Sequence, residues 1–201
     1  LFVAVFFLII ASILFINAGA DQDANPTIEQ TFQKAKRDYL DKNMQSAAEQ
    51  IKKGAAYMNH QASAASAKGK DALAASAREL DVLADDVKNG LVSSPKRMEE
   101  AFARAYLALA ENEHVKATES WAQKKRNQAG EALDSANRHL EKSFAWAGQK
   151  VEKGTAEAMK KSDDLAHQLK KKGSLLADEV GKGIQSAGNE IDKLGKKISP
   201  R

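Results

Sequence analysis

A single hydrophobic repeat runs through the middle of this chain, and it constrains the fold more than any other feature. Between residues 44 and 87, apolar and small residues recur at steps of three and four, with a mean spacing of about 3.6 residues, the period of an α-helix. The repeat keeps its phase across Gly54 and Gly69, and Asn89-Gly90 provides a helix stop. We therefore expect one long helix or two nearly collinear helices here. The residues of the repeat are Met44, Ala48, Ile51, Ala55, Met58, Ala62, Ala65, Gly69, Leu73, Ala77, Leu80, Leu83 and Val87.

Helix start and stop signals divide the segments on either side of this repeat. Asn25-Pro26 suits the start of a first helix that ends near Leu40, because Asn is a good N-cap and Pro is tolerated at the first helical position. Ser93-Ser94-Pro95 starts the next element by the same logic. Residues 112–114 predict a turn or an irregularity, and helical spacing then continues to Ala147.

The two halves of this region repeat one pattern, a shorter helix, a turn and a longer Ala-rich helix. Phe32-x2-Ala35 opens one half and Phe102-x2-Ala105 opens the other. The pattern resembles the helical-hairpin repeats of tetratricopeptide proteins, although their length near 34 residues is not kept, and a plain antiparallel bundle is the favoured alternative. The predicted fold class is all-α: an antiparallel helical bundle or helical-hairpin array with long Ala-rich helices over residues 25–148, plus a C-terminal amphipathic helical tail. In that core, Ile51, Met58, Leu80 and Leu83 are expected to face Phe102, Leu109, Leu133 and Leu140.

The first 20 residues contain no charge and are almost continuously apolar as far as Ile16. Ala18 and Ala20 suit a signal peptidase site, so we expect a signal peptide over residues 1–20, with an uncleaved N-terminal membrane anchor as the alternative. The segment begins with Leu and lacks the usual basic start, which leaves open whether the natural chain begins earlier. On either alternative we expect the rest of the chain to be periplasmic or secreted.

Residues 149–201 form a basic, glycine-spaced tail. Lys and Arg outnumber Asp and Glu in residues 147–201 by four, which is the whole net charge of +4. Leu165, Leu176, Ala187 and Ile198 fall eleven residues apart, and this spacing resembles the amphipathic repeats of apolipoproteins and late-embryogenesis-abundant proteins. Helical glycines each cost about 1 kcal/mol relative to Ala. We therefore expect a partner, a membrane or the bundle to order this tail; a solvated mixed-charge helix face is the alternative interpretation of its charge.

No constellation of residues in the chain predicts a named reaction. There is no cysteine, which excludes disulfides, thiolate metal sites and cysteine nucleophiles, and no phosphate-binding or nucleophile-elbow motif occurs. Glu111-x-x-His114 has the spacing of a di-iron bundle motif, but its one companion is Asp164-x-x-His167, and ordinary surface or turn residues are the favoured interpretation. Trp121 beside residues 124–126 mixes an aromatic with a basic cluster; with Trp146, it is better interpreted as a packing residue.

These observations favour a non-enzymatic, exported helical protein of the cell envelope. It would act as a scaffold, stress-related or binding component through helix–helix contacts, with no catalytic residue, cofactor or metal predicted. The expected partner is another protein or a second copy, together with a possible anionic membrane surface at the tail; nucleic acid is not expected. The alternative function is a membrane-surface or lipid-binding protein that uses the C-terminal amphipathic helix, and a weaker one is a metal-binding bundle that uses Glu111 and His114.

Overall fold

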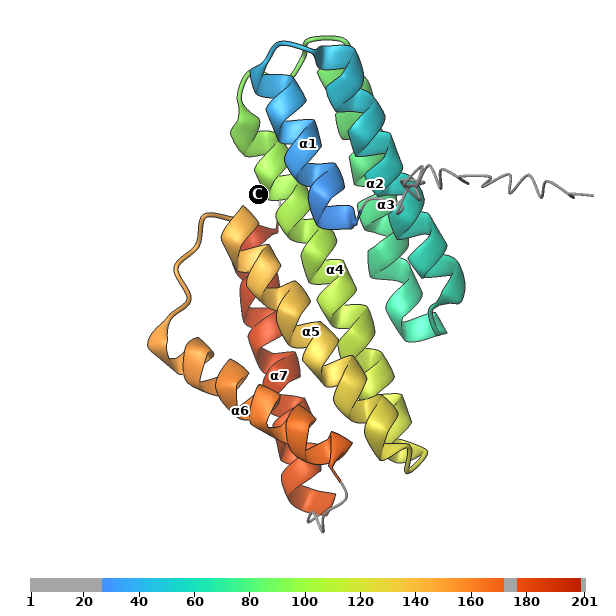
Figure 1. Cartoon of the computed structure of the whole chain (residues 1–201), viewed down its shortest axis with the longest axis vertical. Helices are drawn as coiled ribbons and strands as arrows, with labels where there is room; N and C mark the ends of the chain where they lie inside the picture. Colours follow the sequence, from blue (N-terminus) through green and yellow to red (C-terminus); the bar gives the residue numbers. More distant parts are fainter. Residues whose placement is uncertain (1–26, 172–176, 200–201) are drawn as a thin grey trace, which may run out of the picture.

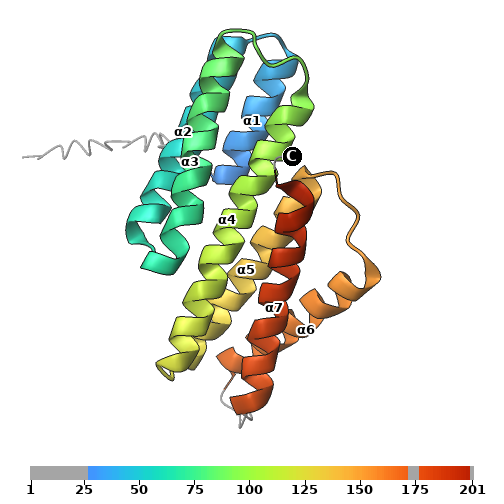
Figure 2. The same cartoon turned by 180° about the vertical axis from the view of Figure 1, so that it is seen from behind.

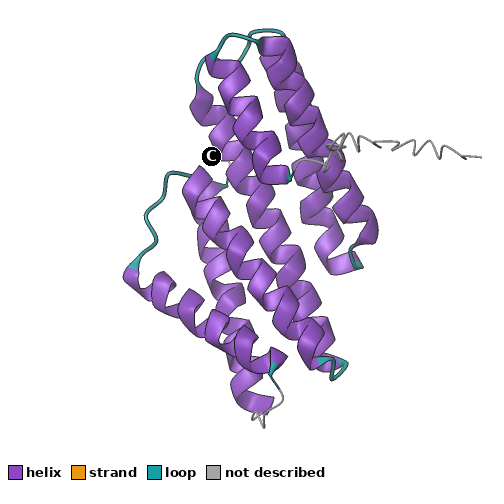
Figure 3. Cartoon of the chain, viewed as in Figure 1, coloured by secondary structure: helices purple, strands orange, loops and turns teal. Residues whose placement is uncertain are grey.

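The computed structural model describes residues 27–171 and 177–199, and every regular element in these two ranges is an α-helix (Figure 3). This confirms the all-α prediction. The leader, Asn25-Pro26 and residues 172–176 lie outside the described residues. In chain order the helices are α1 (Ile28–Leu40), α2 (Met44–Ala64), α3 (Ala67–Lys88), α4 (Pro95–Ala122), α5 (Arg126–Trp146), α6 (Lys153–Lys170) and α7 (Ala177–Ile198).

The central element of the bundle is α4, the longest of these helices. It contacts α1, α3, α5 and α7, and both views show it between the α1–α3 group and the α5–α7 group (Figures 1 and 2). Helices α1 to α5 alternate in direction and are joined by short connections, which makes them an antiparallel bundle. A longer extended connection leads to α6, which crosses α5 obliquely, and α7 then returns along α4.

The first helix begins two residues later than the sequence indicates. Thr27 is its N-cap: the Thr27 hydroxyl accepts a hydrogen bond from the backbone N–H of Gln30, and the Gln30 side chain accepts one from the backbone N–H of Thr27. This reciprocal capping box satisfies two backbone donors that the helix itself leaves free. The predicted end near Leu40 is confirmed, and a turn at residues 41–43 follows it, with Lys42 at φ 64°.

The prediction of one long or two collinear helices over residues 44–87 is wrong. The chain turns back on itself at Ala65 and Ser66, whose extended ψ angles of 152° and 164° end α2 and cap α3. The two helices pack against each other as a hairpin. Helical spacing could not reveal this break, because the two residues preserve the phase and contain neither Gly nor Pro. A hairpin is preferred because it lets both halves of the apolar repeat face the same core.

The predicted turn at residues 112–114 is also wrong, since α4 continues to Ala122 and the turn falls at residues 123–125. Asn112 resembles a turn residue in the sequence but is only 1% exposed within α4. It lies against Gly69 of α3, where a Cβ atom would collide with its side-chain oxygen. A glycine on one helix therefore accommodates an amide on the other.

The buried side chains form two clusters. The larger one joins α1–α4 with the end of α5 and includes Phe32 stacked on Phe102, with ring centroids 4.1 Å apart, and Trp146 edge-on to Phe102. The predicted facing residues all lie in this cluster except Leu133. That part of the prediction is wrong: Leu133 lies on the same face of α5 as Leu140 but two turns earlier, where residues of α4, α6 and α7 form a second cluster with it.

The tail helices complete both clusters. The apolar stripe of α7 is buried, with Val180, Ile184 and Ala187 in the second cluster and Ile191, Leu194 and Ile198 in the first. The bundle itself therefore covers this face in the folded chain. Three glycines of α7 make the close approach possible, since Gly183 faces Leu165, Gly188 faces His114 and Gly195 faces Leu107.

Candidate functional site

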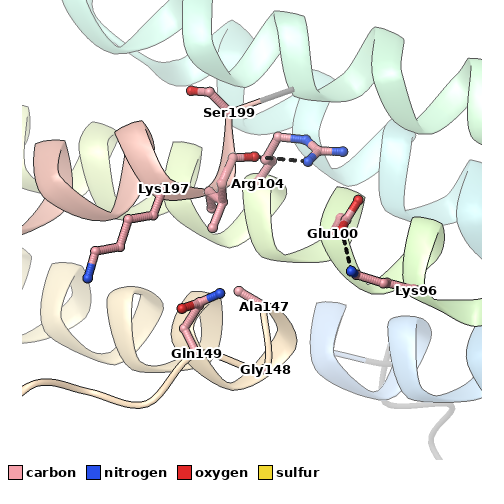
Figure 4. A pocket seen from close by; sticks show the side chains of 9 residues that line it. Lys96, Glu100, Arg104, Ala147, Gly148, Gln149, Lys197 and Ser199 are labelled. Atoms are coloured by element: carbon pink, nitrogen blue, oxygen red, sulfur yellow. Dashed lines mark hydrogen bonds and ion pairs between the residues drawn. The ribbon is translucent and has the colours of Figure 1, made fainter. Parts of the chain in front are cut away.

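One large hollow in the described surface lies where α4 begins and where α5 and α7 end (Figure 4). It has a volume of about 720 Å³, within the range of small-molecule sites. Gln149 and Ala147 lie between Lys197 on one side and Lys96 on the other. The full lining is Lys96, Glu100, Arg104, Ala147, Gly148, Gln149, Lys197, Ile198 and Ser199.

The cations of this hollow already have partners. Arg104 donates to both carboxylate oxygens of Glu79 and, through Nη1, to the carbonyl oxygen of Ile198 at 3.1 Å. Lys197 contacts Glu152 at 2.5 Å, and Lys96 lies 3.8 Å from Glu100. Arg104 is the least exposed of these cations. Its hydrogen bonds join the last turn of α7 to α3 and α4.

Helix ends explain why cations gather in this hollow. The C-termini of α5 and α7 both bring partial negative charge and free carbonyl groups to it, and nearby cations offset that charge. The N-terminus of α4 brings the opposite partial charge to the hollow, but the three cations of the hollow are already paired with protein carboxylates, and Arg104 also with the Ile198 carbonyl. The hollow is therefore better explained as a fastening of the tail than as an anion site.

A second, more apolar hollow lies between α3 and α4. It holds about 270 Å³, and its floor is formed by Leu83 and Ala101 beside Val82, whose side chain is 58% exposed. Arg78, Arg97 and Arg104 surround this floor. Arg97 pairs with Asp86 and Arg104 with Glu79, whereas exposed Arg78 has no ion-pair partner among the described residues. Leu83 and Ala101 are buried, so Val82 is the exposed apolar residue here, and an exposed apolar side chain beside arginines is typical of protein interfaces.

The two carboxylate–histidine pairs considered as metal ligands lie apart from each other. Glu111 and His114 face α7 in a polar hollow of about 360 Å³, whereas Asp164 and His167 are exposed on α6. Among the residues the structure describes, no three His, Cys, Asp or Glu side chains gather closely enough to hold a metal ion. Burial, with the nearby charge of Asp192, raises the pKa of the Glu111 carboxyl.

His114 has a packing role in this arrangement. Its Nε2 lies 2.9 Å from the carbonyl oxygen of Ile184, a distance at which Nε2–H donates a hydrogen bond to α7. The ring also lies directly against Gly188. His114 therefore joins α4 to α7 through one hydrogen bond and through the contact of its ring with Gly188.

The two tryptophans pack into the bundle, and the basic cluster follows Trp121 in the next turn, where the backbone N–H of Lys124 donates to the Trp121 carbonyl. Trp146 is 8% exposed in the main core, and Trp121 packs partly buried against the second cluster. This confirms their interpretation as packing residues. Lys124 and Lys125 lie exposed in the turn between α4 and α5.

A polar cluster that the sequence did not indicate joins α1, α4 and α5. The Tyr106 hydroxyl donates to the Glu29 carboxylate at 2.7 Å, and Lys142 lies 3.6 Å from the same oxygen. Burial alone raises the pKa of Glu29, but hydrogen bonds from Gln33 and Tyr106 hold it below its ordinary value. Burial, followed by the charges of Arg138 and Lys116, lowers the pKa of His139 to about 4. Glu29 and Tyr106 stand 77 positions apart, so no local motif could have revealed the contact.

Comparisons with protein-family models, with curated proteins and with solved structures found no match. The structure itself defines the chain as an antiparallel α-helical bundle with a packed helical tail. Each helix within residues 27–171 and 177–199 is too short or too polar to cross a bilayer.

Proposed function

We propose that this protein is a non-catalytic, exported helical component of the cell envelope that binds other proteins through its helix faces, as a scaffold or stress-related factor. The observation that carries the proposal is the second hollow, between α3 and α4, which we call the α3–α4 groove. Val82 remains exposed beside an apolar floor, and three guanidinium groups surround it.

The chemistry of this groove supports a protein partner over a small molecule. A hollow of about 270 Å³ is below the usual size of ligand sites, and residues of two helices line it. Arginine can pair with a carboxylate through two parallel hydrogen bonds while its stem covers apolar surface. A partner segment that places an apolar side chain on Val82 and carboxylates beside Arg78 would satisfy both features.

The envelope location rests on the sequence of the leader, with its charge-free apolar run and the small residues Ala18 and Ala20. Cell fractionation with an epitope tag at the C-terminus tests it directly. Recovery in the periplasmic or membrane fraction, with cleavage after Ala20, supports export. Recovery of an uncleaved chain in the cytoplasm contradicts it.

A photocrosslinking amino acid at Val82 tests the binding function in cells that produce the protein. Its matched control is the same substitution at Val151, an exposed valine of the α5–α6 connection that does not line the groove. We expect a discrete protein adduct from position 82 and none from position 151. The absence of any adduct at position 82 would overturn the proposed function.

The alternative, a membrane-surface protein that uses the tail, has one supporting feature. All apolar residues of α7 lie on one face, as in helices that lie in a membrane interface. That face is buried against the bundle, so binding would require α7 to separate from α4. Hydrogen exchange of the whole protein with phosphatidylglycerol vesicles tests this alternative. Increased exchange in the second cluster on vesicle addition, reversed by salt, would support it; unchanged exchange would exclude it.

A further inference from the structure

One face of α3 is exposed along its whole length. Its residues recur at steps of four and three, so they form a single stripe on the helix surface. Ala75 and Val82 give this stripe small apolar positions, and Val82 lies near its middle. The exposed α3 stripe consists of Asp71, Ala75, Arg78, Val82, Asp85 and Asn89.

The charges of the stripe are separated along the helix. Arg78 lies one turn before Val82, and Asp85 lies one turn after it. The segment from residue 79 to residue 86 contains four carboxylates and no cation. Asp85 makes one ion pair, with Lys52 at 2.9 Å, in which both side chains are more than half exposed. Such a pair holds its carboxylate weakly and leaves it open to a second cation.

From this arrangement we infer that the α3–α4 surface binds a second copy of the same chain, through antiparallel packing of the two α3 stripes with Val82 near the two-fold axis. The inference rests on the proposed binding function and names its partner. In an antiparallel pair centred on Val82, Arg78 of each copy lies opposite residue 86 and next to Asp85 of the other, because residues 78 and 86 stand four positions either side of Val82. A two-fold axis produces this attraction twice.

The alternative orientation is disfavoured by the same charges. In a parallel pair, Arg78 would face the partner's Arg78, and Asp85 would face the partner's Asp85. Antiparallel packing replaces both repulsions with attractions, and the exposed valines then meet each other rather than water. The surface is therefore complementary to itself in one orientation and not in the other.

The length of α3 limits the strength of this contact. Its 22 residues span about 33 Å, and one pair of helices of this length buries less surface than a standard stable interface. We expect a dimer that forms reversibly at micromolar to submillimolar concentration. Its affinity should fall as salt is added, because the paired charges are close to solvent.

Sedimentation equilibrium of the purified protein over a range of concentrations tests the inference through two charge-reversal variants. Arg78→Glu would place carboxylates against the partner's acidic residues, and Asp85→Lys would place a cation against the partner's Arg78. Each variant alone should raise the dimer dissociation constant at least tenfold. An equimolar mixture should recover association, because the mixed pair contains one native and one reversed attraction.

Lys160→Glu provides the matched control, since Lys160 is an exposed cation of α6 that lies away from α3. This variant should associate like the unmodified protein, and circular dichroism should show equal helicity in every variant. A protein that stays monomeric at 1 mM, or variants that fail to associate when mixed, would overturn self-association. A crosslink from position 82 to a different protein alongside a monomeric purified chain would overturn it while leaving the binding function intact.

Discussion

The imidazole of His114 lies against Gly188, so that a Cβ atom at position 188 would stand 2.7 Å from Cε1 of the ring. The two residues are 74 positions apart and join α4 to α7. The contact gives a physical reason for a glycine in the middle of a helix, where glycine is otherwise unfavourable. Helix α7 thus packs closely because some of its glycines lie where a larger residue would collide with neighbouring side chains.

Gly188→Ala is accordingly expected to destabilise the protein, against the usual helical preference for Ala. The added methyl group must displace the His114 ring, which costs about 1–3 kcal/mol. The matched variant is Gly181→Ala, because nothing lies within 4 Å of a Cβ there. It should stabilise by about 0.5–1 kcal/mol. Urea denaturation measures both, and stabilisation by both variants would contradict the packing of α7 on α4.

Leu83→Asp should abolish cooperative folding at ambient temperature. Leu83 is 2% exposed in the main cluster, and an unpaired buried carboxylate costs a large part of the stability of a typical domain. His114→Ala removes only one interhelical hydrogen bond and one ring contact, so most helicity should remain. Far-ultraviolet circular dichroism during heating measures the helicity and melting temperature of each variant and of the unmodified protein. An unchanged melting temperature of Leu83→Asp would refute the assigned core.

Arg104→Ala should loosen the end of α7 before the rest of the bundle. The guanidinium group holds the Ile198 carbonyl and the Glu79 carboxylate together, and its removal leaves both without that donor. Hydrogen exchange should therefore rise in residues 191–199 and remain unchanged in α2. Arg138→Ala is the control, because Arg138 pairs within α5 and is well exposed. Equal exchange in α7 for both variants would contradict the proposed fastening.

His139 should lower the free energy of unfolding as the pH falls from about 6.5 to about 4. Its pKa is lowered to about 4 in the folded chain, so the unfolded chain binds a proton first as the pH falls. The contribution is fully present above pH 6.5 and is lost progressively towards pH 4. Because the ring is partly exposed, we expect the free energy of unfolding to fall by about 2 kcal/mol, less than the full pKa shift would give.

The His139→Gln variant isolates this effect from the carboxylates, which titrate in the same range. Urea denaturation at several pH values should show a smaller loss of stability in the variant between pH 6.5 and pH 4. Parallel profiles of the two proteins would show that His139 is not the group responsible. The raised pKa of Glu111 acts in the opposite direction, since protonation removes its buried charge and, with it, the repulsion from Asp192.

The candidate surfaces differ in how far the sequence could predict them. Glu111 and His114 share a face by their spacing alone, and the structure confirms only that shared face, since α7 and not a metal-binding cluster lies opposite. The α3–α4 groove could not be predicted, because Arg78 and Arg97 become neighbours only when the α3–α4 connection brings the two helices together. The fastening by Arg104 joins residues 94 positions apart and was equally beyond local patterns.

The sequence by itself determined the helical class, the apolar faces and most turns, because helical periodicity and capping preferences act within a few residues. It could not determine that residues 44–87 form a hairpin, since a break at Ala65 and Ser66 leaves the period unchanged. The continuity of α4 through Asn112 was likewise decided by contact with Gly69 of another helix. Tertiary packing decided these points because burial depends on which faces meet, and residues distant in the sequence supply those faces.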